Sequence, residues 1–271
     1  MSAALDDTIT DDAALGGRLR LLQPKRGHRF GHDAILLAAA VPAKPGERAV
    51  DLGAGVGAAG LALAKRVDGV LLTLIEIDPA LCELARKNAA RNEMADRVSV
   101  VALDVAAPVS SFDDANFKAA SADHVLMNPP FNDAVRTQAS PDAARRVAHV
   151  AQQGSIATWV DAAARLLKPG GMLTLIYRAD GLDVVLEALA RDFESPRVLP
   201  IYPKPGAPPI RVIVQAMRST QARDQKLRAE NLRTTDAKKG SADLCLNGAD
   251  GKPTPEAEAI LRNAAPLPVN D

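Results

Sequence analysis

The stretch that decides the fold is RAVDLGAGVGAAG, residues 48–60. It begins with a short apolar run that suits a buried strand, and an Ala- and Leu-rich run that suits a helix follows the glycines. The glycines permit tight turns and a close approach to a ligand, while the start of the helix offers free N–H groups. Gly55, Gly57 and Gly60 formally fit the spacing of the dinucleotide-binding fingerprint, so the loop alone discriminates weakly between ligands.

Asp51 narrows the choice of ligand. It is two residues before Gly53, at the predicted tip of the strand. A carboxylate there would repel an anionic pyrophosphate, whereas it would hold a cationic ammonium or sulfonium group. Asp51 therefore favours S-adenosylmethionine over NAD. The alternative is a structural role, in which this side chain caps the turn.

Further strand-like runs follow at a regular rhythm, separated by helix-like runs. They are residues 70–77, 98–103, 123–127 and 172–177. Strands separated by helices in this way predict an α/β fold with a parallel, doubly wound sheet. The last two runs, 197–202 and 210–217, are joined by so short a connection that an antiparallel hairpin is favoured.

Acidic residues stand at the ends of two of these strands. Glu76 comes about 20 positions after the glycines, where a carboxylate can accept hydrogen bonds from ribose hydroxyls. Asp78 is instead expected to cap the helix that Pro79 opens. Asp104 could accept a hydrogen bond from an adenine amino group, and a turn-forming Asp is an equally good alternative. Together with Asp51, these carboxylates are expected to converge on one edge of the sheet.

The run DHVLMNPPF, residues 123–131, holds the candidate catalytic residues. Pro129 and Pro130 cannot donate backbone hydrogen bonds and they restrict the residue before them, so the strand must stop at Asn128. The Asn128 side chain is then presented at the carboxyl end of the strand, where ligands bind in open α/β sheets. A strand ended by a proline turn is the plain alternative. The polar segment 132–146 that follows is expected to be a lid or substrate-binding element.

Composition excludes several classes of protein. The 271 residues carry 33 basic and 33 acidic side chains, so no global basic field requires nucleic acid, and a polyanion would have to use a local patch. Cys82 and Cys245 have no metal-like spacing with His, which argues against a disulfide scaffold and a zinc site. No run is long enough to span a bilayer and the N-terminus is acidic, unlike a signal peptide. We therefore expect a cytoplasmic protein without a membrane or metal partner.

The two ends of the chain differ from its middle. We expect residues 1–17 to be a flexible tail, because they carry four Asp residues and little to bury. Residues 18–218 hold the predicted domain, and residues 219–271 read as a C-terminal appendage with a last helix near 255–263. Basic side chains that could contact phosphate, or simply be solvated, are Lys25, Arg26, Arg29, Arg145 and Arg146.

These motifs together resemble the Rossmann-like S-adenosylmethionine-dependent methyltransferases. Residues 51–57, DLGAGVG, are similar to their cofactor loop, and Asn128 to Phe131 are similar to the motif of the amino-methylating subgroup. Within that subgroup, GGRLRLLQPKRGHRFGHDAILLAA and YPKPGAPPIRVIVQAMRS resemble the bacterial tRNA1(Val) adenine-37 N6-methyltransferases. The resemblance spans residues 16–217, with a weaker match around 250–262.

The resemblance implies a mostly parallel seven-stranded sheet whose last strand is antiparallel, and a tRNA as the partner. It also implies that residues 30–33 close over the methionine end of the cofactor, although His32 stands where the family more often has Thr. The implied cofactor contacts are Phe30, Asp33, Asp51, Gly53, Ala54, Gly55, Gly57, Glu76, Ile77, Asp104, Val105 and Asn128.

The chemistry explains why such a motif suits an adenine N6, whose lone pair is delocalised into the ring. If the Asn128 side-chain oxygen and the Pro129 carbonyl each accept one N–H, the nitrogen is drawn toward tetrahedral geometry and its growing positive charge is stabilised. Pro130 stiffens the turn, and Phe131 would stack on the base. The base must be flipped or unstacked to enter, and no metal or general base is required.

Other functions stay open on the residues alone. A protein glutamine amide presents a similar NH2 on a planar group, and DNA adenines or small molecules are also conceivable acceptors. A cofactor- or RNA-binding protein without turnover, and an NAD-dependent oxidoreductase, are the remaining alternatives. The intact motif at residues 128–131 argues against the former, and Asp51 argues against the latter.

Overall fold

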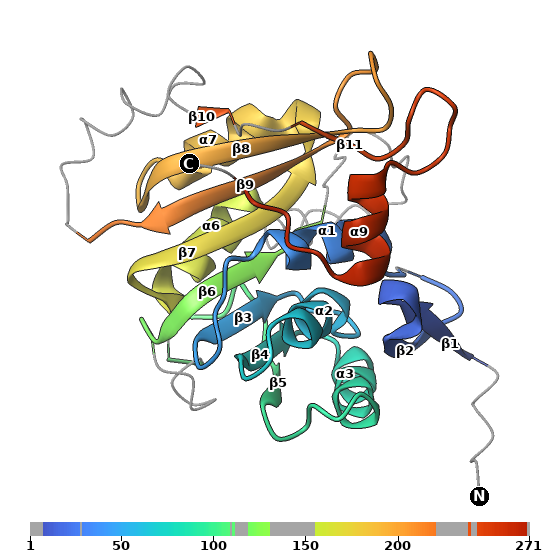
Figure 1. Cartoon of the computed structure of the whole chain (residues 1–271). Coiled ribbons are helices and arrows are strands. Elements are labelled where there is room, and N and C mark those ends of the chain that lie inside the picture. The colour runs from blue at the N-terminus through green and yellow to red at the C-terminus, as the bar shows by residue number, and fades with distance from the viewer. Residues whose placement is uncertain are drawn as a thin grey trace, which may run out of the picture.

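The computed structural model describes residues 8–27, 29–108, 110–111, 119–130, 155–220, 238–239 and 243–269. One central sheet dominates this part of the chain (Figure 1). Its main strands lie in the order β5-β4-β3-β6-β7-β9-β8. Their bounds are Arg48–Leu52 for β3, Leu71–Glu76 for β4, Val98–Ala102 for β5, Ala122–Met127 for β6, Leu167–Arg178 for β7, Phe193–Tyr202 for β8 and Arg211–Arg218 for β9.

The strand directions confirm the predicted doubly wound sheet. Strand β3 pairs in parallel with β4 and β6, and the pairs β4–β5 and β6–β7 are also parallel. Strand β9 is antiparallel to both β7 and β8, as the short connection between the last two strands predicts. Two further short strands, β10 (Lys238–Lys239) and β11 (Leu244–Cys245), pair in parallel with β8 and cover its outer edge.

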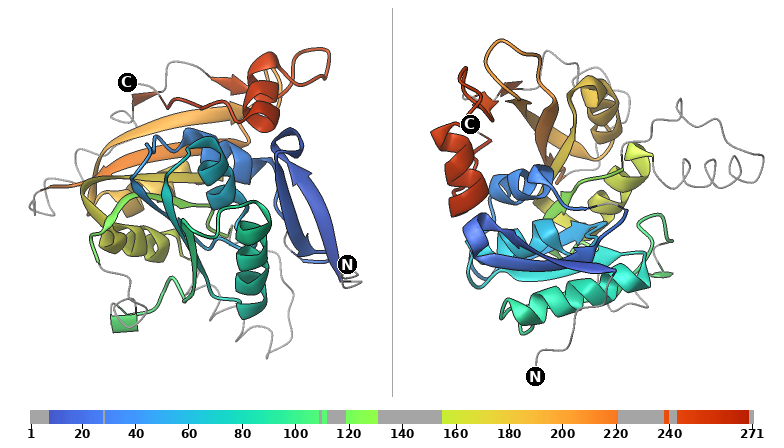
Figure 2. Two further views of the ribbon diagram at one scale, coloured as in Figure 1. Left: turned by 60° about the horizontal axis from the view of Figure 1, so that its bottom comes forward. Right: turned by 90° about the vertical axis from the view of Figure 1, so that its right-hand side faces the viewer.

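Helices cover both faces of the sheet (Figure 2). Alternate residues of a strand point to opposite faces, so Ala49 packs in a core with α1, α2 and α3, while Val50 and Leu52 pack in a second core with α6 and α7. The first set of helices comprises α1 (His32–Ala40), α2 (Ala58–Arg66) and α3 (Pro79–Arg91). The second comprises α6 (Ile156–Leu166) and α7 (Leu182–Leu189), which follows the short 3-10 turn η2 (Ala179–Gly181).

The prediction of a flexible tail over residues 1–17 is wrong for residues 8–17. Strand β1 (Ile9–Ala14) pairs antiparallel with β2 (Leu19–Pro24), and the 3-10 turn η1 (Leu15–Gly17) joins them. Leu15, Leu19 and Leu21 are buried in the same core as α1 and α2. The hairpin therefore packs on the body of the fold.

Two of the four acidic residues that suggested a tail, Asp11 and Asp12, are ion-paired. Asp11 bridges Arg20 of β2 at 3.0 Å and Arg91 of α3 at 2.7 Å, and Asp12 pairs with Arg29 at 2.9 Å. Hydrogen bonds from Arg91 and Arg20 hold the pKa of Asp11 below its usual value. The charges thus fasten β1 to β2 and α3.

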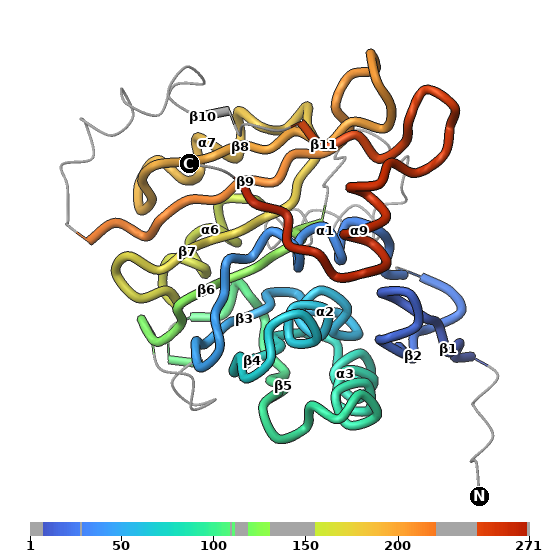
Figure 3. The backbone as a smooth tube through the Cα atoms, viewed as in Figure 1, coloured from blue at the N-terminus to red at the C-terminus, as the bar shows by residue number. Residues whose placement is uncertain are grey.

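The C-terminal residues pack on the same body. Helix α9 (Pro255–Asn263) lies against η1 and α1, and the chain then runs back along α1, where the Leu267 N–H donates to the carbonyl of Ala39 at 2.9 Å (Figure 3). Four buried side chains of this segment belong to the core of α1 and α2, namely Leu244, Ile260, Leu267 and Val269. The described part of the expected appendage therefore shares a core with the main domain.

Candidate active site

A cavity of about 300 Å³ opens at the carboxyl end of β3 and β6. Many of the predicted cofactor residues line it. They come from the glycine loop, the start of α1 and the end of β6. The lining residues are Arg29, Phe30, Gly31, His32, Asp33, Ala34, Asp51, Gly53, Ala54, Gly55, Val56, Ala58, Ala59, Leu81 and Asn128. Gly57, Glu76, Ile77, Asp104 and Val105 are not in this lining.

Asp51 makes a structural hydrogen bond and also lines the cavity. Its Oδ2 accepts a hydrogen bond from the N–H of Gly60, in the first turn of α2, at 2.8 Å, so it caps that helix. The side chain also lines the cavity and is only 2% exposed. Burial raises the pKa of Asp51 to about 7; the Gly60 hydrogen bond opposes this shift and the charge of Glu76 adds to it. Its charge therefore changes near neutral pH.

Glu76 shapes the glycine loop from β4. One carboxylate oxygen accepts from the N–H of Gly55 at 2.8 Å and the other from the N–H of Asp78 at 2.9 Å. The carboxylate oxygens keep further lone pairs, which ribose hydroxyls could use. Ile77, the next residue, is 58% exposed. Asp78 caps α3 as predicted, accepting from the N–H of Ala80 at 2.7 Å.

Asp104 lies in a turn after β5. Its Oδ1 accepts from the N–H of Ala106 at 2.8 Å, which matches the turn-forming alternative considered for it. Val105 is buried, and its carbonyl accepts from Arg165 of α6 at 3.4 Å. Neither Asp104 nor Val105 belongs to the lining of the cavity.

Asn128 directly follows the last residue of β6, as the prolines predict. Its Oδ1 is buried and has no hydrogen-bond partner among the described residues, although the residue lines the cavity. A buried acceptor without a donor costs about 1–3 kcal/mol, so a ligand N–H would be favoured there. Pro129 is buried and Pro130 is exposed. Phe131 lies outside the described residues.

The segment before α1 and the first turn of this helix are held by bonds from two strands. The N–H of Phe30 donates to Gln23 of β2 at 3.1 Å, and Asp33 pairs with Arg211 of β9 at 2.8 Å. Phe30 is half-buried and His32 is exposed. Phe30 and Asp33, which both line the cavity, are therefore held by β2 and β9.

The predicted phosphate contacts divide into three groups. Arg29 is already engaged, because it pairs with Asp12 and donates to Thr10 and to the carbonyl of Pro24. Lys25 and Arg26 are exposed, and they precede in sequence the residues 29–34 that line the cavity. Arg145 and Arg146 lie outside the described residues. Arg29 thus already has partners within the protein, and its contact with phosphate stays a prediction.

Sequence reasoning missed two side chains that support the site. Asn88 of α3 is fully buried, accepts from the N–H of Leu22 at 2.7 Å, and donates to the carbonyls of Leu22 at 2.9 Å and Val56 at 3.0 Å. Its amide on the apolar face of α3 is a signal that could have revealed it. Trp159 of α6 lies against Gly53, and no local pattern indicates that contact.

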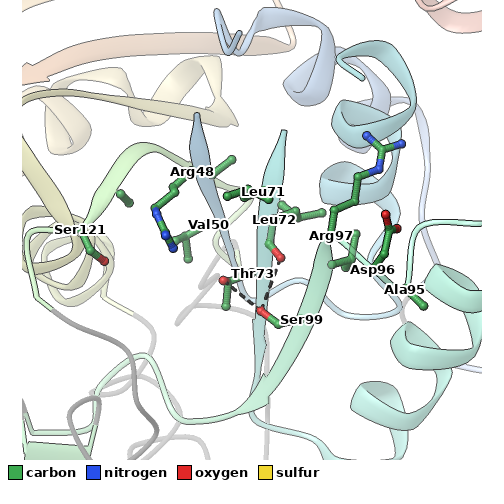
Figure 4. A pocket seen from close by; sticks show the side chains of 13 residues that line it. Arg48, Val50, Leu71, Leu72, Thr73, Ala95, Asp96, Arg97, Ser99 and Ser121 are labelled. Carbon is green, nitrogen blue, oxygen red and sulfur yellow. Dashed lines mark hydrogen bonds between the residues drawn. The ribbon is translucent and has the colours of Figure 1, made fainter. Parts of the chain in front are cut away.

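A second cavity, of about 290 Å³, lies at the opposite end of β3, β4 and β5 (Figure 4). Some of its polar side chains are paired: Ser99 donates to Thr73 at 3.1 Å, and Arg97 pairs with Asp68 at 3.2 Å. It contains none of the predicted cofactor or catalytic residues. Of these two cavities, only the one at the carboxyl end of the sheet is lined by predicted site residues.

Metal and membrane features are absent from the described residues. They contain no group of three or more His, Cys, Asp or Glu that could hold a metal ion. Their helices include none long and apolar enough to cross a membrane. Cys82 and Cys245 are both free thiols.

Comparison with known proteins agrees with this geometry. The family model for the methyltransferase small domain matches residues 29–199. A tRNA1(Val) (adenine(37)-N6)-methyltransferase from Tolumonas auensis is 26% identical over 88% of this chain and 90% of its own length. A relative of the same name from Porphyromonas gingivalis is 30% identical, over 68% and 72% respectively.

A crystal structure of a predicted O-methyltransferase from Agrobacterium tumefaciens is 25% identical, with a TM-score of 0.69 over 88% of this chain and all of that one. The two proteins therefore share the mostly parallel, helix-flanked sheet described above. The chain therefore belongs to the methyltransferase small domain family and is an S-adenosylmethionine-dependent methyltransferase.

Proposed function

We propose that this enzyme methylates the N6 amino group of an adenine in RNA, and that the RNA is a tRNA. The observation that carries the proposal is the buried Oδ1 of Asn128, which lines the cavity without a donor among the described residues. An exocyclic NH2 group supplies two such donors. The relatives named as tRNA adenine-N6 methyltransferases support the choice of acceptor.

The residues of the cavity fit the cofactor. A Cβ on Gly55 would meet nothing within 4 Å, so the loop leaves open space beside the cavity. The Asp51 carboxylate suits a cationic group, and Glu76 and Asp104 suit hydroxyl and amino donors. We propose that these three residues hold the cofactor with Phe30, Asp33 and the glycine loop. When bound, the cofactor supplies an electrophilic methyl group.

The protein then has to present the acceptor nitrogen. The Asn128 oxygen would accept one N–H of the amino group and the Pro129 carbonyl the other. These two acceptors would direct the lone pair toward the methyl group and stabilise the positive charge that develops on nitrogen. Pro129 and Pro130 keep the turn rigid, and Phe131 would stack on the base.

The acceptor RNA would be held near this edge by a local basic surface. Lys25 and Arg26 are exposed and next to Arg29, which lines the cavity. We propose that these two contact phosphates, together with Arg145 and Arg146. Arg29 would instead orient β1 and β2 through its bond to Asp12.

A labelled-methyl transfer assay tests the proposal. The protein is incubated with labelled S-adenosylmethionine and, separately, with total tRNA, ribosomal RNA, duplex DNA and a protein extract. We expect label in tRNA. Label in protein alone would favour a glutamine amide and overturn the RNA assignment, and label recovered as an O-methyl group would overturn the nitrogen assignment.

A further inference from the structure

Trp159, the only tryptophan of the chain, lies directly beneath the cofactor loop. A Cβ placed on Gly53 would be 2.3 Å from Cη2 and 2.8 Å from Cζ3 of the indole. The edge of the ring is therefore in van der Waals contact with the Gly53 backbone. Gly53 also has a φ of 67°, a conformation that residues with a Cβ rarely adopt.

The indole belongs to the core that supports three site loops. Leu52, Val105 and Met127 lie in the same buried cluster as Trp159, and each is next in sequence to a predicted site residue. A hydrogen bond also joins α6 to one of these loops, since Arg165 donates to the Val105 carbonyl at 3.4 Å. Helix α6 is therefore tied to the loops that follow β3 and β5.

We propose that Trp159 is a positioning residue for S-adenosylmethionine. Its ring supports Gly53 from the side away from the cavity and so fixes where the backbone of Ala54 and Gly55 meets the cofactor. The three atoms nearest to a Cβ on Gly53, apart from those of its two chain neighbours, all belong to this indole. The inference concerns cofactor binding and is independent of which acceptor the enzyme uses.

Binding of S-adenosylhomocysteine to the full-length protein tests this role. Trp159→Phe keeps an aromatic ring but shortens its reach toward Gly53. We expect the Kd from calorimetry to rise roughly tenfold, since a shift of about 1 Å in the backbone that contacts a ligand lowers affinity strongly. Trp159 emission in the wild type should also change on saturation, with a midpoint at the calorimetric Kd.

Phe193→Leu is the matched control. Phe193 is another buried aromatic residue of the same cluster, at the start of β8. This variant should lose stability yet keep its Kd within about twofold of the wild type, because β8 lies four strands away from β3 in the sheet. The proposal is overturned if Trp159→Phe binds as the wild type does, if both variants lose affinity equally, or if saturation leaves the emission unchanged.

Discussion

Replacing Asp51 by Asn separates its two roles. The amide oxygen of Asn can still accept the hydrogen bond that the Gly60 N–H donates at 2.8 Å, so the cap of α2 is kept. The negative charge, however, is lost from a side chain that is 2% exposed and lines the cavity. The variant therefore tests the charge alone, and Asp51→Ala, which also loses the cap, is its control.

The effect on stability follows from the raised pKa. Burial moves the pKa of Asp51 from 3.8 to about 7. Between these values the native protein holds a proton that the unfolded chain has released, so this group makes the wild type less stable as pH rises from about 4 to about 7. The full shift corresponds to about 4 kcal/mol, of which about 2 kcal/mol falls between roughly pH 5.5 and 8.5.

Asp51→Asn lacks this titration. Urea unfolding of both proteins at the two ends of that pH window should show the variant gaining about 2 kcal/mol relative to the wild type as pH rises. Cofactor affinity should move in the opposite sense. Only the ionised carboxylate attracts the cation, so wild-type affinity should rise about tenfold from roughly pH 6 to 8 through this group, whereas the variant should bind weakly without that component.

Two results would refute this reasoning. Equal pH dependence of unfolding in the wild type and the variant would mean that Asp51 is ionised as usual despite its burial. Wild-type cofactor affinity in Asp51→Asn, together with weak binding in Asp51→Ala, would mean that the side chain acts only as the cap of α2.

Three further variants probe the rest of the site. Asn128→Ala should leave the cofactor Kd within about twofold but lower kcat by roughly 100-fold or more in the methyl-transfer assay, and an active variant would contradict its role. Asn88→Ala should lower the free energy of unfolding by about 2–4 kcal/mol, because it removes the partner of the Leu22 N–H and of the Leu22 and Val56 carbonyls at a buried side chain. Asn92→Ala, which removes similar bonds to Arg20 at a less buried site, should cost less, and equal losses would count against the role of burial. Joint replacement of Lys25 and Arg26 by Ala should reduce the slope of log affinity for RNA against log salt by roughly 1.4, and an unchanged slope would remove them from the phosphate contacts.

The fold was largely predictable because its signals are local. Apolar runs separated by helices predicted the parallel sheet, and a connection of a few residues predicted the antiparallel β8–β9 pair. The glycines and prolines likewise marked where β3 and β6 end. Each of these signals lies within a single element or turn.

The errors came from partners that are distant in sequence. Asp11 looked like part of a solvated tail because one of its partners, Arg91, lies on a helix that no local pattern connects with it. The ion pair of Arg29 with Asp12 was likewise not predicted, because the two residues are 17 positions apart. The contact of Trp159 with Gly53 joins α6 to the loop after β3, so only the folded chain reveals it.

Nucleoside analysis of the reaction product tests the central claim most directly. Unmodified tRNA is incubated with S-adenosylmethionine and either the wild type or Asn128→Ala, then digested and analysed by mass spectrometry against methyladenosine standards. We expect N6-methyladenosine from the wild type and a severe loss of it from the variant. Methylation on a ring nitrogen or on ribose, or equal yields of N6-methyladenosine from both proteins, would contradict the account.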